Sequence, residues 1–479
     1  MKKLLVYLKT YKKETILAPL FKMLEALFEL FVPLVIAAII DTGIENKDVP
    51  YIVRMAIVLV VLAIVGLTCS LTAQYFSAKA AVGFAAKLKS ALFAHIESLS
   101  FKEIDTLGTS TLITRMTSDI NQVQSGVNLV LRLFLRSPFI VFGAMIMAFT
   151  IDVKAALIFV VAIPLLAIVV FGIMLVSIPL FKKVQGALDS VLGITRQNLT
   201  GVRVIRAFNN EQSEIENFDE KNAVLTGLQK FVGKISALMN PVTFIIVNGA
   251  IAALIWVGAL RVDAGILSQG QVVALVNYMS QILVELVKLA NLIITVTKAV
   301  ACGNRIQSVF EIKSSMEEGS RRYSASSEDD YSIEFKNVNL CYNEGADSSL
   351  TGIDFSVRKG ETVGIIGGTG SGKSSLVGLI PRFYDATQGQ VLVDGVNVNE
   401  YSFDELREHV GIVMQKAVLF KGTIRENLKW GKNDATDEEL WAAIDAAQAR
   451  EFVETKDGGL DFEIAQGGKN LSGGQKQRL

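Results

Sequence analysis

The chain has 479 residues, with 47 basic and 47 acidic side chains, and 51% of its residues are hydrophobic. This length exceeds what one hydrophobic core supports and favours two to four domains. The balanced charge gives no sign of a nucleic-acid-binding surface. Three distant cysteines, Cys69, Cys302 and Cys341, form no metal or disulfide motif, which is typical of a reduced, cytoplasm-facing chain.

The N-terminal stretch, residues 1–13, places five lysines among apolar residues. This pattern predicts an interfacial helix on the cytoplasmic side of a membrane. No small-residue cleavage site follows, so we expect a retained membrane helix after it rather than a signal peptide.

Six apolar runs follow, each near or above the roughly 20 residues that a bilayer-spanning helix needs. They cover residues 16–40, 52–77, 128–150, 155–181, 241–262 and 272–297. A large soluble core of buried helices is the alternative, but six runs of this length in one part of the chain favour a membrane domain over residues 1–310.

The connections after the second and fourth runs are long and polar, and those after the first, third and fifth are short. The later long connection carries eight basic residues: Lys182, Lys183, Arg196, Arg203, Arg206, Lys221, Lys230 and Lys234. Positive charge marks the cytoplasmic side, which therefore holds the N-terminus and the C-terminal part of the chain. Helical periodicity within both long connections predicts helical hairpins that continue beyond the membrane.

Few ionisable residues fall within the runs, and Lys22, Glu25 and Glu29 are the clearest. Acidic groups at membrane depth suggest a cavity for cationic or amphipathic substrates. The plainer alternative is that Lys22 reaches the interface and pairs with Glu25. Asn248, Asn277 and Glu285 are weaker candidates of the same kind.

Residues 311–330 are hydrophilic, have no apolar period and predict a linker before a second domain over residues 331–479. Alternating residues predict strands at 332–338 and 350–357. A β-branched run, Val363 to Ile366, then predicts a strand that leads into a glycine loop and an apolar helix.

The glycine loop has the P-loop spacing Gly-x4-Gly-Lys-Ser in the required context of strand, loop and helix. Its phosphate-binding residues are Gly367, Gly368, Thr369, Gly370, Ser371, Gly372, Lys373, Ser374 and Ser375. Glycines let consecutive N–H groups close on an anion. We expect Lys373 to reach the β- and γ-phosphates and Ser374 to hold Mg²⁺.

Three further features belong to this domain. Asp394-Gly395 ends a short strand and predicts a hairpin turn rather than a metal-binding aspartate. Gln415 follows a predicted strand at 410–414, where ligand-sensing groups of α/β sheets lie. Ser472, Gly473, Gly474 and Gln475 open a helix with a serine N-cap, which predicts a second anion-binding loop.

The P-loop, the Leu471–Gln475 motif and six spans together resemble a half-transporter of the ATP-binding cassette (ABC) exporter family, of the multidrug and lipid exporter type. The resemblance implies a helical six-span domain followed by an α/β P-loop nucleotide-binding domain. It implies that Tyr342 stacks on adenine and that Gln415 senses Mg²⁺ and the γ-phosphate. It also implies that Ser472 to Gln475 contact ATP held by a second half-transporter, the same or a homologous chain.

The same resemblance makes Phe101–Asp119 and Thr200–Phe208 intracellular loops that dock on nucleotide-binding domains. It makes Asp461–Gly468, with Glu463 at its acidic position, a segment that touches the loops of the partner. The implied function is ATP-dependent export of a small amphipathic molecule, drug, lipid or peptide across the plasma membrane.

The chain departs from the family pattern because it ends four residues after the signature. The family places its Mg²⁺-associated aspartate strand, catalytic glutamate and switch histidine later, and His95 and His409 do not match that histidine. We therefore expect no catalytic residue within these 479 residues, an incomplete nucleotide-binding domain and poor hydrolysis by the chain alone. A non-hydrolysing regulatory subunit of a heterodimer is the alternative function.

Overall fold

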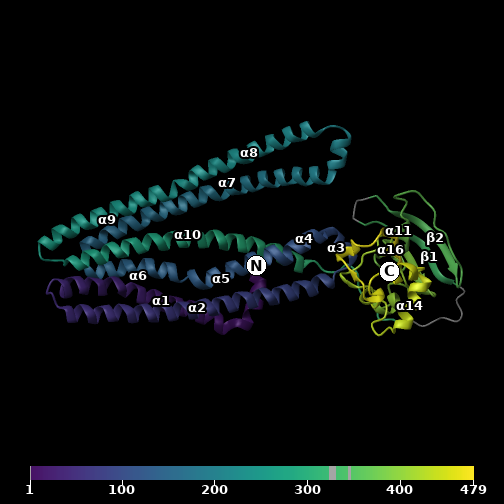
Figure 1. Ribbon diagram of the computed structural model, residues 1–479, viewed down its shortest axis with the longest axis horizontal. Coiled ribbons are helices and arrows are strands. Elements are labelled where there is room, and N and C mark those ends of the chain that lie inside the picture. Colours follow the sequence, from purple (N-terminus) through teal and green to yellow (C-terminus); the bar gives the residue numbers. More distant parts are fainter. Residues whose placement is uncertain (1, 323–330, 343–346) are drawn as a thin grey trace. The chain divides into compact units, whose positions relative to one another are not determined.

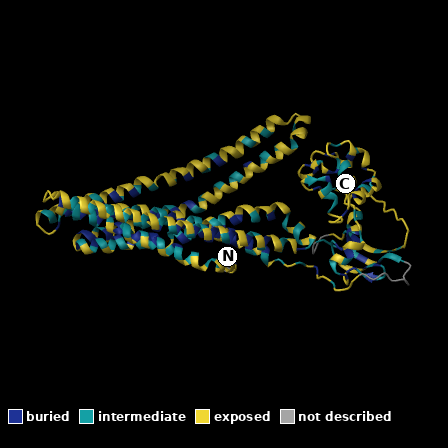
Figure 2. Cartoon of the chain, turned by 60° about the horizontal axis from the view of Figure 1, so that its bottom comes forward, coloured by how far each residue is buried: buried dark blue, intermediate teal, exposed yellow. Residues whose placement is uncertain are grey.

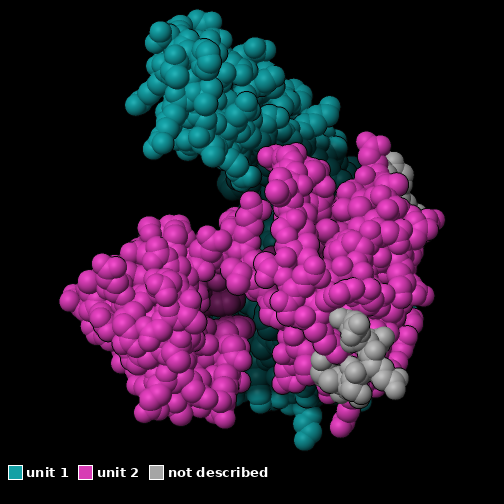
Figure 3. Space-filling view, turned by 90° about the vertical axis from the view of Figure 1, so that its right-hand side faces the viewer, with its two compact units in different colours: residues 1–98, 107–313 teal, residues 99–106, 314–479 magenta. Residues whose placement is uncertain are grey.

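The computed structural model of the protein describes residues 2–322, 331–342 and 347–479. The chain forms two compact units, which Figure 3 shows in different colours. Unit 1 comprises Met1–Ser98 and Leu107–Lys313, and unit 2 comprises Leu99–Thr106 and Ser314–Leu479. Part of the predicted linker, residues 323–330, lies outside the described residues.

Unit 1 is helical. Its elements are η1 (Lys2–Tyr11), α1 (Lys12–Ala38), η2 (Ile39–Ile44), α2 (Val49–Glu97), α4 (Thr109–Thr114), η3 (Arg115–Asp119), α5 (Ile120–Leu133), α6 (Arg136–Ile151), α7 (Val153–Ala207), α8 (Glu211–Ala237), α9 (Met239–Asp263) and α10 (Gln269–Glu311). Six helical stretches are long and apolar enough to cross a membrane, which confirms the prediction of six spans.

Side-chain caps fix where these helices begin. Asp48 accepts a hydrogen bond of 3.0 Å from the Tyr51 N–H before α2, and Asp152 accepts one of 2.8 Å from the Ala155 N–H before α7. Ser268 and Gln271 form a capping box at the start of α10. Each cap satisfies N–H groups that the helix itself leaves unpaired, so the short connections between spans are sharply defined.

The core of unit 1 lies between α1, α6, α7, α9 and α10 and contains many alanines, which let helices approach closely. Its largest polar member is Tyr278, whose hydroxyl donates a 2.6 Å hydrogen bond to the Leu30 carbonyl. By contrast, the outer faces carry exposed apolar side chains, and Figure 2 shows exposed residues along the long helices. In α2 only 6% of the most apolar 18-residue stretch is buried. An apolar exterior of this kind fits contact with lipid.

Helices α2 and α7 are 49 and 55 residues long, well over twice the roughly 20 residues of a bilayer span. Helices α7 and α8 run side by side as a hairpin in Figure 1, with the turn at Phe208–Asn210. The prediction of a helical hairpin is therefore confirmed for the long connection after the fourth run.

Unit 2 contains a four-stranded antiparallel sheet in the order β2-β1-β3-β4. Its strands are β1 (Tyr331–Leu340), β2 (Leu350–Arg358), β3 (Gln388–Val393) and β4 (Val396–Asn397). The turn between β3 and β4 has positive φ at Asp394 (47°) and Gly395 (78°), and Val393 pairs with Val396. The predicted hairpin turn is confirmed, because two consecutive positive φ angles are what such a two-residue turn requires.

The remaining elements of unit 2 are short. They are α3 (Phe101–Leu107, of which the last residue falls in unit 1), α11 (Lys373–Leu379), α12 (Phe403–His409), β5 (Gly422–Thr423), α13 (Ile424–Leu428), α14 (Asp437–Ala446), α15 (Arg450–Glu454), η4 (Gly459–Asp461), β6 (Glu463–Ile464), η5 (Gln466–Gly468) and α16 (Gly473–Arg478). Two separate hydrophobic clusters hold unit 2 together, one under the four-stranded sheet and one among α13, α14 and α15.

Two predicted strands, Val363–Ile366 and residues 410–414, are wrong. Neither segment has regular secondary structure, and most of their apolar side chains face solvent, with Ile366 98% exposed and Val413 78% exposed. A strand exists only where a neighbour accepts and donates its backbone hydrogen bonds, and no described segment of this chain pairs with these two. Their β-branched composition alone does not supply that partner.

Candidate functional site

The glycine loop before α11 adopts a conformation that its sequence requires. Gly370 and Gly372 both have φ of +84°, which side chains resist. A Cβ atom on Gly372 would also lie 2.7 Å from the Ser349 carbonyl oxygen, so the loop passes closely over the start of β2. The glycine pattern thus shapes the backbone here as a phosphate-binding loop needs.

The Lys373 ammonium lies inside this loop. It donates hydrogen bonds of 2.7 Å to the carbonyls of Gly367 and Gly368 and one of 3.3 Å to Ser371 Oγ. A cation held by loop carbonyls stands ready for an anion, because a phosphate offers stronger, charge-assisted hydrogen bonds than a carbonyl does. The role of Lys373 on the β- and γ-phosphates stays a prediction.

Ser374 and Ser375 differ in their surroundings. The Ser374 side chain is exposed and makes no hydrogen bond among the described residues, so its hydroxyl oxygen is open to a hard cation such as Mg²⁺. Ser375 instead accepts a 2.8 Å hydrogen bond from the Tyr342 hydroxyl, which sequence reasoning did not anticipate. The predicted adenine-stacking tyrosine is therefore tied directly to the P-loop helix.

Gln415, the other residue predicted to hold Mg²⁺, is exposed in a segment without regular structure. No hydrogen bond joins it to Ser374 within the described residues, so the structure does not bring these two ligands together. Oxygen donors of both types suit Mg²⁺, which supplies Lewis-acid stabilisation of phosphate charge when bound. No cluster of three His, Cys, Asp or Glu residues that could hold a metal occurs among the described residues.

The signature Leu471–Gln475 begins α16 with a reciprocal cap. Ser472 Oγ accepts from the Gln475 N–H at 3.3 Å, and Gln475 Oε1 accepts from the Ser472 N–H at 3.0 Å. Gly473 and Gly474 are exposed, with no atom within 4 Å of where a Cβ would stand. No described hydrogen bond or ion pair connects the signature to the P-loop. The predicted serine N-cap is confirmed, and both glycines present open backbone.

Charged residues also gather inside unit 1. Lys22 forms a 2.6 Å ion pair with Glu25 and a 3.1 Å hydrogen bond with Ser70. Both charged side chains are mostly buried. The ion pair between Lys22 and Glu25, which the plainer alternative predicted, is therefore present.

Glu29 has a different partner, Arg136 of α6, at 2.6 Å. Arg136 is buried and also contacts Glu285 of α10 at 2.6 Å, while Ser137 and Lys288 donate to Glu285 at 2.8 Å each. Sequence reasoning missed Arg136, although an arginine inside the apolar run 128–150 was a visible signal. The structure joins α1, α6 and α10 through this arginine.

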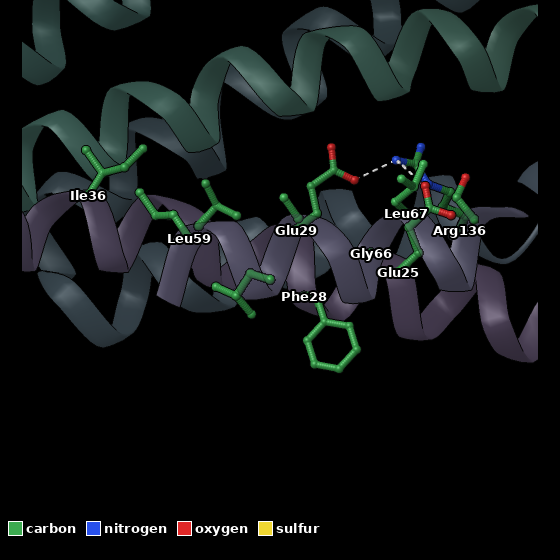
Figure 4. Close-up of a pocket in the computed structure, with 12 residues that line it drawn as sticks. Glu25, Phe28, Glu29, Ile36, Leu59, Gly66, Leu67 and Arg136 are labelled. Carbon is green, nitrogen blue, oxygen red and sulfur yellow. Dashed lines mark hydrogen bonds and ion pairs between the residues drawn. The ribbon is translucent and has the colours of Figure 1, made fainter. Parts of the chain in front are cut away.

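Two cavities adjoin Glu29, with volumes of about 570 and 330 Å³. Glu29, Val32 and Ile36 line both. Figure 4 shows the larger one between α1 and α2, with Glu29 and Arg136 pointing toward one another and Glu25 close to Arg136. Most of the remaining wall is apolar. A cavity of this size, apolar with a few converging polar groups, suits a drug-sized amphipathic ligand.

Comparison with known families places both units. The profile described as the ABC transporter transmembrane region matches residues 15–286, which is more than half of the chain. The profile described as ABC transporter matches residues 350–479. The chain belongs to the ABC transporter family. One membrane region followed by one nucleotide-binding region is the architecture of a half-transporter, as the sequence predicted.

Relatives of this ABC transporter extend over nearly its whole length. An uncharacterized ABC transporter ATP-binding protein of Mycobacterium tuberculosis is 34% identical, covering 99% of this chain and 81% of its own. A Bacillus subtilis protein provisionally named as a multidrug export ATP-binding/permease protein is 32% identical over 100% of this chain and 83% of its own. An ATP-dependent lipid A-core flippase of Desulfotalea psychrophila is 32% identical over 78% of this chain and 64% of its own.

These matches support ATP-dependent export by a half-transporter as the function of the chain. The substrate differs between the names of the relatives, so it has to be inferred from the membrane cavity of this chain.

Proposed function

We propose that this ABC half-transporter exports amphipathic organic cations across the plasma membrane at the expense of ATP, as one half of a dimer. The observation that carries the proposal is the position of Glu29, whose carboxylate lies between two cavities of the membrane unit. The positive charge on residues 182–234 supports a cytoplasmic nucleotide-binding region and N-terminus.

Charge and exposure favour a cation over an anion in this cavity. Glu29 has 41% of its side chain exposed and uses one oxygen atom, Oε2, for Arg136. Arg136 is only 7% exposed, and both of its terminal nitrogens are already bonded to carboxylates. In the larger cavity Glu29 is the most exposed charged side chain. Its Oε1 atom can accept from an ammonium donor while Phe28, Leu59 and their neighbours contact the apolar body.

ATP is the energy source in this proposal. Residues Gly367 to Ser375 would hold its phosphates, Tyr342 would stack on its base, and Ser472 to Gln475 would contact the ATP of the second half-transporter. Ser374 would hold Mg²⁺ through its open hydroxyl, and Gln415 would join it as a ligand only after its exposed segment moves toward the loop. ATP that touches both halves binds the closed dimer more tightly than the open one, and this difference in affinity drives the conformational change.

The alternative is a regulatory subunit that binds ATP while a different chain hydrolyses it. The open backbone of Gly473 and Gly474 favours a productive role, because the signature then serves ATP on the other half. Two measurements decide between them. Cation-stimulated ATP hydrolysis by a dimer of this protein supports the exporter, and ATP binding by this protein with hydrolysis only after a different half-transporter is added supports the regulatory subunit.

The substrate class is tested by uptake of a fluorescent hydrophobic cation into inside-out proteoliposomes. Glu29→Gln keeps the size of the side chain and removes its charge, and we expect at least a roughly ten-fold loss of cation uptake, which corresponds to one charge-assisted contact. Glu45→Gln, an exposed glutamate outside the cavity lining, is the matched control. Equal uptake by Glu29→Gln and wild type would contradict the proposal.

A second variant fills the cavity without altering charge. Gly66 lines the larger cavity, and a Cβ added there meets no atom within 4 Å, so Gly66→Leu projects into open space. We expect loss of cation uptake with ATP binding preserved. Lys373→Ala should abolish ATP-dependent uptake altogether, which separates a failure of the nucleotide site from a failure of the cavity.

A further inference from the structure

A chain of three aromatic and hydroxyl contacts runs through unit 2, from helix α3 to the P-loop helix. The Tyr384 hydroxyl donates a 2.6 Å hydrogen bond to Asp105 Oδ2 of α3. The Tyr384 ring meets the Tyr342 ring at 4.9 Å and 88°, an edge-to-face pair. The Tyr342 hydroxyl donates to Ser375 Oγ at 2.8 Å. All of these residues belong to unit 2.

The backbone around Tyr384 is firmly held. Arg382, which is only 3% exposed, forms a 2.7 Å ion pair with Asp385 and donates a 2.9 Å hydrogen bond to the Glu317 carbonyl. Phe383 packs on Phe101 of α3 at 4.8 Å. The Tyr384 side chain therefore projects from a fixed segment, and its contacts with Asp105 and Tyr342 are not those of a loose loop.

The surroundings of Tyr384 also keep its hydroxyl protonated. Burial, followed by the hydrogen bond and the charge of Asp105, raises the pKa of Tyr384 above its ordinary value of 10.0. A hydroxyl that stays protonated remains a donor to the Asp105 carboxylate, and a charged acceptor makes this bond stronger than a neutral one. The link between α3 and Tyr384 is thus maintained at any physiological pH.

A cavity of about 510 Å³ adjoins these residues. Tyr342, Tyr384, Thr387 and Lys102 of α3 line it, so one wall comes from the predicted base-stacking residue and another from α3. The position of α3 consequently affects the space next to Tyr342.

We propose that Tyr384 is a positioning residue that makes the affinity for the nucleotide base depend on helix α3. The inference rests on the proposed function, because it takes Tyr342 as the base-stacking residue. An edge-to-face partner and a hydroxyl contact at opposite ends hold the Tyr342 ring in one orientation. If α3 moves away, the Tyr384 hydroxyl loses its hydrogen bond to Asp105 and the Tyr384 side chain can change its orientation. The Tyr342 ring then loses its edge-to-face partner.

The coupling is reciprocal. Helix α3 follows α2, a helix of the membrane unit, directly in the chain. If the position of α3 changes the affinity for the base, then binding of the base changes the preferred position of α3 by the same free energy. Tyr384 thereby gives the membrane unit a route to sense whether a base, and not only a phosphate, is bound.

Equilibrium titration of the detergent-purified full-length chain with ATP and with inorganic tripolyphosphate, which lacks a base, tests the inference. Tyr384→Phe keeps the ring and removes the hydroxyl, and Asp105→Asn weakens the same hydrogen bond from the other side. We expect both variants to bind ATP roughly three- to ten-fold more weakly, with unchanged affinity for tripolyphosphate. Tyr331→Phe, another tyrosine of unit 2 without contact to Tyr342, is the control and should match wild type.

The outcomes separate cleanly. Equal weakening of ATP and tripolyphosphate would mean a general loss of structure at the P-loop and would overturn the positioning role. Unchanged ATP affinity in both variants would overturn it as well. Wild-type protein that binds tripolyphosphate but gains nothing from the base would refute base stacking by Tyr342, while protein that binds neither ligand would refute the proposed function itself.

Discussion

Arg136 of the membrane unit and Arg425 of the nucleotide-binding unit each bind more than one carboxylate. Arg136 lies between Glu29 and Glu285 at 2.6 Å each, and its side chain is 7% exposed. Arg425 contacts Asp461 at 2.8 Å and also Asp437, but its side chain is 27% exposed and both aspartates are more than 60% exposed. Both clusters consist of a guanidinium group between carboxylates, but the cluster around Arg425 is much more exposed to water.

This difference decides how much each cluster matters for stability. Water screens the exposed cluster, so its ion pairs add little to stability. Arg136 and Glu285 have lost most of their hydration, and removing Arg136 leaves the buried Glu285 carboxylate with Lys288 as its remaining charged partner. The comparison teaches that the fold depends on Arg136 far more than on Arg425, although both look alike in a list of ion pairs.

The largest effect is expected for Arg136→Leu. Glu285, only 4% exposed, and Glu29 would both lose their main partner, and breaking a buried ion pair typically costs about 3–5 kcal/mol. We expect a large fall in the thermal unfolding midpoint of the purified protein. If Arg136→Leu unfolds at the wild-type temperature, burial does not distinguish the two clusters and the comparison fails.

An intermediate effect on stability is expected for Glu103 of α3, a partly buried carboxylate that is held by hydrogen bonds. Burial alone would raise the pKa of Glu103, but hydrogen bonds from Ser100 and Ser315 outweigh it and lower the pKa from its ordinary value of 4.5. A lowered pKa adds stability above pH 4.5 that is lost as the pH falls through the pKa of the folded protein.

Ser315→Ala removes one of these donors and checks the sign. At pH 7 the variant should unfold at a lower temperature than wild type, and the gap should narrow as the pH is lowered below 4.5. Ser190→Ala, an exposed serine of α7, should show no pH-dependent gap. A gap that widens toward acid pH would mean that Glu103 is not stabilised as a carboxylate.

The smallest effect is expected for Arg425→Ala. Arg425 donates hydrogen bonds to the Asp461 carboxylate, and these bonds lower the pKa of Asp461. Because the pair is exposed, we expect the unfolding midpoint to change by no more than about 2 °C at physiological salt. A fall comparable to that of Arg136→Leu would show that exposure is a poor guide to the energetics of this protein.

The sequence predicted those features that depend on local pattern or on composition. Six spans followed from length and hydropathy, and the Asp394-Gly395 turn followed from residues that tolerate positive φ. The Ser472 cap followed from the position of a serine directly before two glycines that open a helix. None of these features needs a distant segment of the chain.

Features that depend on distant partners were not predictable in this way. Arg136 was visible as a charge in an apolar run, but its partners lie on α1 and α10, more than a hundred residues away on either side. Tyr384 had no sequence signal at all, because its role comes from Asp105, 279 residues earlier. The strand predicted at Val363–Ile366 failed for the same reason, since a strand is defined by its neighbours.

The length of α7 has a mechanical consequence. Its 55 residues correspond to a rod of about 80 Å, against a hydrocarbon thickness of about 30 Å. A rod of this length that tilts by about 10° around its middle moves each end by roughly 7 Å, more than one helical turn. A small tilt of α7 within the membrane therefore becomes a displacement of several ångströms at Phe208, the residue that follows the helix.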